Sequence, residues 1–139
     1  MDTSVFLMAA DGSDPRHDCA SWLLDQIAKG RFECIVSTVS VSELLTGAMA
    51  RGASKAVATQ TLLRQYPHLQ IAPVTMDVAA DAADLWVATR IRLPDALILA
   101  TAVVNGVEVV LHGDAEWTSR VAPVLTRPRL VDLNELCGA

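Results

Sequence analysis

Residues 92–114 read RLPDALILATAVVNGVEVVLHGD, and this stretch is the most informative one about the fold. Residues 94–105 are almost all apolar and begin with a proline, which suits the first turn of a helix, and Gly106 supplies a terminator. Residues 107–111 are mostly β-branched or apolar, as in a short buried strand. A long apolar helix that leads directly into a buried strand predicts an α/β protein.

The same alternation of helix and strand continues on both sides of this stretch. Further helices are predicted over residues 15–29, 39–51, 54–66, 76–91 and 115–121, and further strands over residues 32–38, 70–74 and 129–133. Parallel neighbouring strands need crossover helices between them, so this order predicts a mostly parallel central sheet.

Individual residues refine the predicted helices. Asp14 is expected to cap the first of them, and Trp22 is expected on its apolar face with Leu23 and Ile27. Trp86 and Trp117 also lie in apolar patterns. We therefore predict that the tryptophans pack in a core or an interface rather than against nucleic-acid bases.

Length and hydropathy favour one domain over residues 1–139, because 139 residues of 52% hydrophobic composition suit a single compact core. The longest apolar run, residues 96–104, is too short to cross a bilayer, which takes about 20 residues. The first residues also lack the basic start of a signal peptide. The prediction is a soluble cytoplasmic protein without a membrane segment.

Charge and cysteine content exclude other classes. A net charge of -5 argues against a broadly basic protein that binds nucleic acid non-specifically. Cys19, Cys34 and Cys137 stand singly, without the spacing of a zinc site or of a disulfide framework. They are predicted to be free thiols.

Three acids stand where an α/β sheet gathers functional groups, beyond the carboxyl ends of strands. Asp114 follows the strand over residues 107–111, Glu43 lies early in the helix after residues 32–38, and Asp95 lies in the first turn of its helix. Asp95 by itself could equally be an acid that stabilises a helix start by about 0.3–1 kcal/mol.

A second group of acids has a simpler interpretation. Asp77, Asp81 and Asp84 are spaced to share one side of a helix. We expect Asp77 to cap that helix and the other two acids to form a solvated face, rather than a metal site.

Four segments of the sequence together resemble those of one known protein family. They are DTSVFL at Asp2, STVSVSELLTG around Glu43, RLPDALILATAVVNGVEVVLHGD from Arg92 and GDAEW at Asp114. In this order and at these intervals, across almost the whole chain, they resemble the PIN-domain ribonucleases, and most closely the VapC-type toxins of toxin–antitoxin pairs. The resemblance implies a three-layer α/β/α fold around the mostly parallel sheet.

The resemblance also implies a function. The chain is expected to be a metal-dependent endoribonuclease that cleaves RNA by metal-activated water and is inhibited by a cognate antitoxin. The expected catalytic residues are Asp2, Glu43, Asp95 and Asp114; the expected ligands of Mg²⁺ or Mn²⁺ are Asp2, Asp95, Asp114 and Glu116; and the expected substrate-binding residues are Thr3, Ser4 and Arg92. Carboxylates packed this closely repel one another unless a divalent cation is bound.

The partners follow from the same resemblance. Related toxins pair, so we expect a homodimer through residues 41–63, which are rich in small and apolar side chains. An antitoxin is expected to place an apolar segment in a groove beside the acids and a basic side chain toward them. Exposed cations such as Arg51, Lys55 and Arg64 either guide RNA or only keep the surface polar.

Two features depart from the family pattern. Family members usually begin with an apolar strand that delivers the first aspartate, whereas Asp2 follows Met1 directly. The sequence start lies upstream, or the chain is truncated, or SVFLM does part of the work of that strand. In addition, His112 and Gly113 replace a Thr or Ser followed by Asn before Asp114; His112 is expected to end the strand, or otherwise to contact a phosphate.

These departures leave two alternatives open. The chain could be a PIN-fold binding or regulatory module in which catalysis is impaired, or it could be a stand-alone RNA-processing nuclease without an antitoxin. Metal-dependent cleavage separates the toxin from the impaired module, and an adjacent gene for an antitoxin separates it from the stand-alone nuclease.

Overall fold

The computed structural model describes residues 1–138. Its elements are α1 (Thr3–Ala10), α2 (His17–Ala28), β1 (Cys34–Ser37), α3 (Thr38–Ala50), α4 (Ala53–Gln65), β2 (Leu69–Ala72), α5 (Met76–Thr89), α6 (Leu93–Val104), β3 (Val109–His112), the π-helix η1 (Trp117–Val121), β4 (Arg129–Asp132) and α7 (Leu133–Leu136). The predicted order of helices and strands is confirmed, with shifts of a few residues at the boundaries. The predicted helix over residues 115–121 ends as a π-helix.

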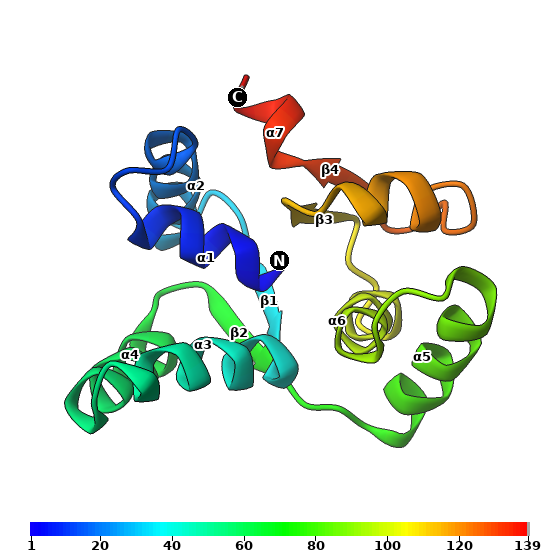
Figure 1. The fold of residues 1–139 in the computed structure, drawn as a ribbon, viewed down its shortest axis with the longest axis horizontal. Coiled ribbons are helices and arrows are strands. Elements are labelled where there is room, and N and C mark those ends of the chain that lie inside the picture. Colours follow the sequence, from blue (N-terminus) through cyan, green and yellow to red (C-terminus); the bar gives the residue numbers. More distant parts are fainter. Residues whose placement is uncertain (139) are drawn as a thin grey trace.

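The strands form two parallel pairs with helices on both sides (Figure 1). β1 pairs with β2, with Cys34 opposite Leu69, and β3 pairs with β4, with Val109 opposite Arg129. Parallel pairing was predicted and is confirmed. Within residues 1–138 the parallel strands of the predicted α/β fold form two pairs that strand-type hydrogen bonds do not join directly.

The N-terminus lies between the two pairs (Figure 1). The Met1 ammonium donates to the Ile35 carbonyl in β1 at 3.0 Å, and the Asp2 backbone N–H donates to the Leu111 carbonyl in β3 at 3.0 Å. Met1 and Asp2 thus occupy the position of a central strand without forming one. Burial lowers the pKa of this ammonium, while the nearby Cys34 and Asp2 oppose that shift.

The segment SVFLM does not act as a strand. Residues 3–10 form α1, and Asp2 is its N-cap, accepting a hydrogen bond from the Ser4 N–H at 3.4 Å. A side-chain acceptor at this position satisfies one of the unpaired N–H groups at a helix start. The helix therefore begins directly after the two residues that lie between the strand pairs.

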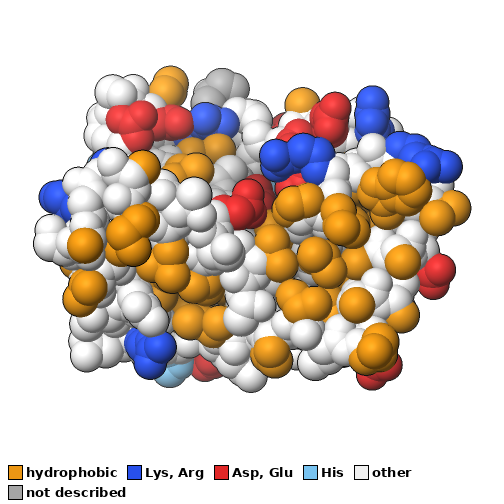
Figure 2. All heavy atoms as spheres, turned by 60° about the horizontal axis from the view of Figure 1, so that its bottom comes forward, with side chains coloured by type: hydrophobic (Ala, Val, Ile, Leu, Met, Phe, Trp, Pro, Cys, Tyr) orange, Lys and Arg blue, Asp and Glu red, His pale blue; other side chains and the backbone are white. Residues whose placement is uncertain are grey.

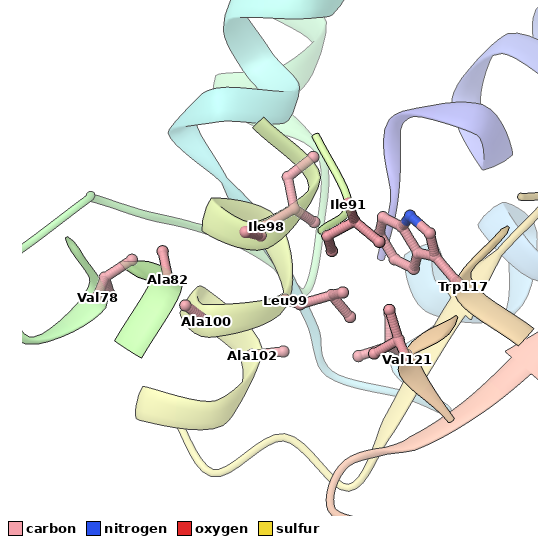
Figure 3. Close-up of a cluster of buried hydrophobic side chains, with 11 residues drawn as sticks. Val78, Ala82, Ile91, Ile98, Leu99, Ala100, Ala102, Trp117 and Val121 are labelled. Carbon is pink, nitrogen blue, oxygen red and sulfur yellow. The ribbon is translucent and has the colours of Figure 1, made fainter. Parts of the chain in front are cut away.

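The apolar helix α6 is central to the larger core. Its buried side chains pack against α5, η1 and β3 in a cluster formed by Val78, Ala82, Ile91, Ala96, Ile98, Leu99, Ala100, Ala102, Val110, Trp117 and Val121 (Figure 3). Burial on several sides explains why this helix is apolar around most of its circumference. None of the helices in residues 1–138 combines the length and apolar character needed to cross a membrane.

The tryptophans differ from one another. Trp117 is fully buried, as predicted, whereas 55% of Trp22 and 38% of Trp86 is exposed. The prediction that Trp22 lies on the buried face of its helix is wrong, although Leu23 and Ile27 do lie there. The apolar pattern of α2 is wider than the surface that its neighbours cover.

Two predicted helix caps are also wrong. α2 begins at His17 after Arg16, and the Asp14 carboxylate accepts hydrogen bonds from the backbone and side chain of Arg16. This pairing lowers the pKa of Asp14 to about 2. In α5 the cap is Thr75, whose hydroxyl accepts from the Val78 N–H at 3.2 Å, and Asp77 lies in the first turn. Asp14 therefore pairs with Arg16 instead of capping α2, and Thr75 caps α5 in place of Asp77.

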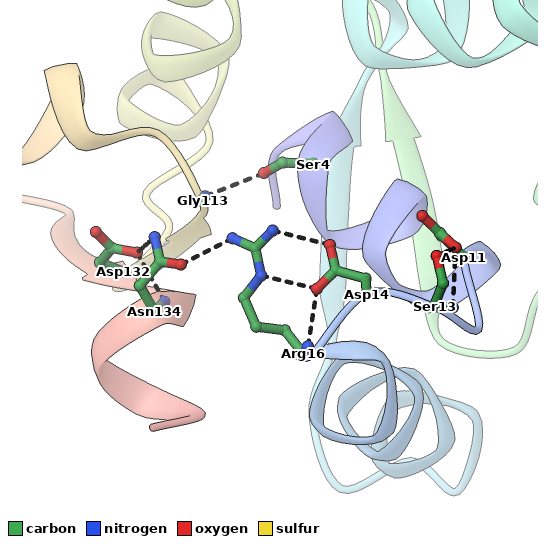
Figure 4. A network of polar contacts seen from close by, with 8 residues as sticks. All are labelled: Ser4, Asp11, Ser13, Asp14, Arg16, Gly113, Asp132 and Asn134. Atoms are coloured by element: carbon green, nitrogen blue, oxygen red, sulfur yellow. Dashed lines mark hydrogen bonds and ion pairs between the residues drawn. The ribbon is translucent and has the colours of Figure 1, made fainter. Parts of the chain in front are cut away.

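Cys19 and Cys137 form a disulfide, which corrects the prediction of free thiols. They are 118 residues apart in the sequence, and α7 folds back toward α2 to bring their Cα atoms within 5.8 Å. Arg16 lies in the same region and donates to Asn134 at 2.8 Å (Figure 4). Spacing alone carries no sign of such a contact. Cys34 is a buried free thiol, and burial raises its pKa.

Candidate active site

Asp2 is placed by backbone contacts and by its own helix. Its N–H is held by β3 through Leu111, and its carboxylate accepts the Ser4 hydroxyl at 2.6 Å. Only 7% of the residue is exposed. The carboxylate is therefore fixed at the start of α1, where the helix dipole favours a negative charge.

Glu43 comes to the same place from α3. The Thr3 hydroxyl, at the first position of α1, donates to Glu43 Oε1 at 2.9 Å. α1 and α3 also pack against each other. Adjacent residues at the start of α1 therefore bring two acids together, one in their own segment and one about forty positions away in the sequence.

Asp95 lies in the first turn of α6 and is 4% exposed. Arg92 donates to it twice, from Nε to Oδ2 at 3.1 Å and from Nη2 to Oδ1 at 3.3 Å. Burial raises the pKa of Asp95, the Arg92 contact opposes this, and the charges of Asp2 and Asp114 raise it further.

The pKa of Arg92 is sensitive to three of the acids. Its pKa is raised, first by the hydrogen bond and charge of Asp95 and further by the charges of Glu43 and Asp114. Arg92 therefore lies within electrostatic reach of Asp95, Glu43 and Asp114, and Asp95 lies within reach of Asp2 and Asp114.

Asp114 is held by backbone contacts after β3. Its N–H donates to His112 Nδ1 at 3.2 Å, and the preceding Gly113 N–H donates to the Ser4 hydroxyl at 3.0 Å (Figure 4). Ser4 also donates to Asp2, so one hydroxyl connects the loop of Asp114 with the carboxylate of Asp2. A Cβ at position 113 would overlap the Met8 methyl group, so a larger residue there would require the Met8 side chain to move.

His112 is a buried residue that contacts the backbone of Asp114. It is 1% exposed, ends β3 and stacks on Trp117 with ring centroids 5.3 Å apart. Burial lowers its pKa, and Nδ1 accepts a hydrogen bond, so the neutral ring carries its proton on Nε2. Of the two predictions for His112, the end of a strand is confirmed and contact with a phosphate is excluded by burial.

Glu116 lies at the edge of the site. Its backbone N–H donates to Asp114 Oδ1 at 2.8 Å, but its side chain is 54% exposed and approaches Arg120 at 3.9 Å. Direct contacts thus link Asp2 to the loop of Asp114 through Ser4 and place Glu43 against Thr3 at the start of α1. Asp95 is paired with Arg92, and Glu116 lies at the edge.

The donor set suits a hard divalent cation, because every candidate ligand is a carboxylate. The buried, mutually repelling position of Asp95 is also one that a cation would relieve. Within residues 1–138, however, no group of three or more acids, histidines or cysteines is already arranged to hold an ion. The carboxylates are suitable ligands for a divalent cation, and in this structure they accept hydrogen bonds from Arg92, Thr3 and Ser4.

The fold and this site define the class of the protein. The family model of the PIN domain matches residues 1–122, which include every predicted site residue. The chain belongs to the PIN domain family.

Two solved structures share the fold. A toxin–antitoxin complex from Klebsiella pneumoniae has a TM-score of 0.70 and 22% identity, covering 95% of this chain and 94% of the other. The VapBC2 complex from Rickettsia felis, bound to a DNA fragment from its promoter, has a TM-score of 0.69 and 14% identity, covering 94% of each chain. A comparison with curated proteins found no match.

Proposed function

We propose that this protein is a VapC-like toxin, a metal-dependent endoribonuclease kept inactive by a cognate antitoxin. The observation that carries the proposal is that Thr3 and Ser4 at the start of α1 contact Glu43, Asp2 and the loop of Asp114, while Asp95 lies within electrostatic reach of Asp2 and Asp114. Membership of the PIN domain family and the similarity in fold to two toxin–antitoxin structures support it.

In this proposal Asp2, Asp95 and Asp114, with Glu116 at the edge, bind Mg²⁺ or Mn²⁺. The bound cation would supply an activated water and stabilise the negative charge of a phosphate under attack. Glu43 is held by Thr3, which keeps its carboxylate beside the other acids and available to accept a proton.

Arg92 has two partners in the proposed cycle. Its guanidinium is paired with Asp95, yet 68% of its side chain is exposed. Cation binding to Asp95 would compete with this pair and release Arg92 toward the phosphate of the RNA, for which a planar guanidinium is well suited.

The antitoxin is proposed to bind along α3. An open groove of about 600 Å³ is lined there by Thr38, Val41, Ser42, Leu45, Thr46, Met49 and Ala50, and Glu43 belongs to the same helix. Its apolar residues suit an amphipathic helix, and a basic side chain at the end of that helix would reach the acids.

The homodimer is proposed to use the neighbouring surface of α4 within residues 41–63. Val57 and Leu62 are 63% and 59% exposed in the isolated chain, an arrangement that favours association. Sedimentation should give a dimer at micromolar concentration, and Leu62→Lys should give a monomer. A wild-type monomer under these conditions would rule out this interface.

The decisive experiment for the function is RNA cleavage by the purified protein with Mn²⁺ or Mg²⁺. Cleavage should stop with EDTA and return with added metal. Mn²⁺ affinity measured by calorimetry should fall in Asp95→Asn and stay unchanged in Asp84→Asn, whose carboxylate lies on α5. Cleavage that persists in EDTA would refute the metal dependence.

A PIN-fold binding module with impaired catalysis is the second candidate. It is favoured by one observation, that Asp2, Glu43 and Asp95 each accept a side-chain hydrogen bond from a donor of this chain. Mn²⁺ binding without cleavage of any RNA would select it.

A further inference from the structure

Arginines gather beside the acids on an otherwise acidic molecule. The chain carries a net charge of -5. Nevertheless, Figure 2 shows blue Lys and Arg side chains next to the red acids in the middle of the upper edge and further along to the right. Cationic side chains therefore lie directly beside the acids in this part of the surface.

Hydrogen bonds and ion pairs form a continuous path from the site to three arginines. The Glu116 N–H donates to Asp114, Arg120 approaches Glu116 at 3.9 Å, and Arg120 Nη1 donates to the Arg90 carbonyl at 3.5 Å. Arg92 pairs with Asp95 on the other side. Arg90, Arg92 and Arg120 thus surround one border of the acid cluster.

The backbone between α5 and α6 presents two of these arginines outward. Arg90 adopts a left-handed conformation with φ 58°, which is uncommon for a residue with a side chain. Ile91, the next residue, is 1% exposed and anchors the turn in the core. Arg90 and Arg92 on either side are exposed.

An aromatic surface completes the path. Trp86 is 38% exposed, and the Arg90 guanidinium lies 4.3 Å from the centroid of its ring. Among residues 1–138 Arg90 forms no ion pair with an acid, so its charge is available to an anion. Cations beside an exposed indole are the combination that binds phosphates and stacks bases.

We infer that Arg90, Arg92, Arg120 and Trp86 form a binding surface for single-stranded RNA next to the scissile phosphate. Single-stranded rather than duplex RNA is specified because an indole stacks only on a base that is unpaired and accessible. The inference rests on the proposed nuclease function, and it gives Trp86 a base-stacking role that its sequence pattern favours less than packing.

The chain supplies matched controls. Lys55 and Arg64 are exposed cations on α4 with no ion pair to another residue of the described chain. They carry the same charge as the proposed surface without the adjacent acids and indole. If net charge alone governs RNA binding, their substitution has the same effect as substitution of Arg90 or Arg120.

The test measures binding of a fluorescein-labelled single-stranded RNA of about 16 nucleotides by anisotropy in EDTA, so that no cleavage occurs. Arg90→Gln and Arg120→Gln should each weaken binding and reduce the slope of log affinity against log salt by about 0.7. Trp86→Ala should weaken binding roughly fivefold or more with an unchanged slope, and Trp86→Phe should retain most of the affinity.

Lys55→Gln and Arg64→Gln should bind like the wild type, and all variants should melt at the wild-type temperature. Equal losses in the control and arginine variants, or wild-type binding by Arg90→Gln and Arg120→Gln, would overturn the inference. So would tighter binding of duplex than of single-stranded RNA.

A cleavage assay on the same variants separates this inference from the function itself. If the wild type cleaves RNA and the arginine variants cleave and bind equally well, the surface is wrong and the nuclease stands. If the arginine variants lose binding while Asp95→Asn cleaves like the wild type, the surface stands and the catalytic assignment fails. A wild type that binds no RNA refutes both.

Discussion

Two groups of acids in this molecule behave in opposite ways. Asp77, Asp81 and Asp84 are close in sequence and lie on one helix, with Asp77 and Asp84 exposed and Asp81 partly so. Asp2, Glu43, Asp95 and Asp114 are spread over more than a hundred residues, yet the charges of Asp2 and Asp114 raise the pKa of Asp95, and Glu43 and Asp114 both act on Arg92. The acids that are close in sequence are solvated on α5, whereas the proposed site draws on acids from distant parts of the sequence.

The difference lies in what holds each carboxylate. Within residues 1–138 the acids of α5 accept no side-chain hydrogen bond and form no ion pair, as expected for a solvated face. Asp2, Glu43 and Asp95 each accept a hydrogen bond from a hydroxyl or guanidinium. Buried charges need such partners, so the contacts that fix the acids also make their burial tolerable.

The largest expected difference between the two groups is catalytic. Asp95→Asn should lower RNA cleavage by about 10²-fold or more, because it removes a charged group at the phosphate under attack. Asp84→Asn should leave the rate unchanged. Rates are compared with saturating Mn²⁺ and at equal thermal stability. Equal rates for wild type and Asp95→Asn would reduce Asp95 to an acid that only favours a helix start.

A smaller loss should follow when the support of Asp114 is removed. His112→Phe keeps the ring on Trp117 but leaves the Asp114 N–H without an acceptor, and we expect roughly a tenfold loss of cleavage. His112→Asn offers an oxygen in place of Nδ1 and should recover most of the rate. Mn²⁺ affinity is measured in parallel. If His112→Asn and His112→Phe lose equal activity at equal melting temperature, the hydrogen bond has no positioning role.

Asp95, unlike the exposed acids of α5, should make the free energy of unfolding depend on pH. Burial raises the pKa of Asp95, so the native protein binds this proton more tightly than the unfolded chain. The resulting stabilisation is fully present below the unfolded pKa of about 3.9 and is lost as the pH rises through the raised native value.

Asp95→Asn should therefore melt a few degrees higher than the wild type at neutral pH, on the order of 2–4 °C, with no advantage near pH 4. Calorimetric scans without divalent metal provide the measurement. A lower melting temperature for Asp95→Asn at neutral pH would mean that the pair with Arg92 contributes more than burial costs.

The smallest effect is expected on α5. Asp84→Asn should change the free energy of unfolding by less than about 0.5 kcal/mol, since the side chain is exposed and unpaired within the described chain. Urea unfolding measures it. A loss above about 1 kcal/mol would show that this acid has a structural partner and would weaken the comparison.

The sequence by itself determined the elements and the chemistry of the acids. The apolar run of α6, the short β-branched strands and the glycines at helix ends are local patterns, and they predicted the parallel α/β arrangement. The order of the acid-bearing segments predicted the PIN domain family, which the family model confirms. Hydrophobic periodicity predicts a helix or strand correctly where one face of that element is buried in the fold.

Only the tertiary structure decided how distant residues meet. The disulfide joins Cys19 and Cys137, and Ser4 connects Asp2 with Gly113. Met1 and Asp2 hydrogen-bond to β1 and β3 and so lie between the two strand pairs. The inward position of His112 and the exposed position of Trp22 depend equally on which neighbours pack against them. These contacts join residues far apart in the chain, and no periodicity or local propensity encodes a contact whose free energy exists only after the whole chain has folded.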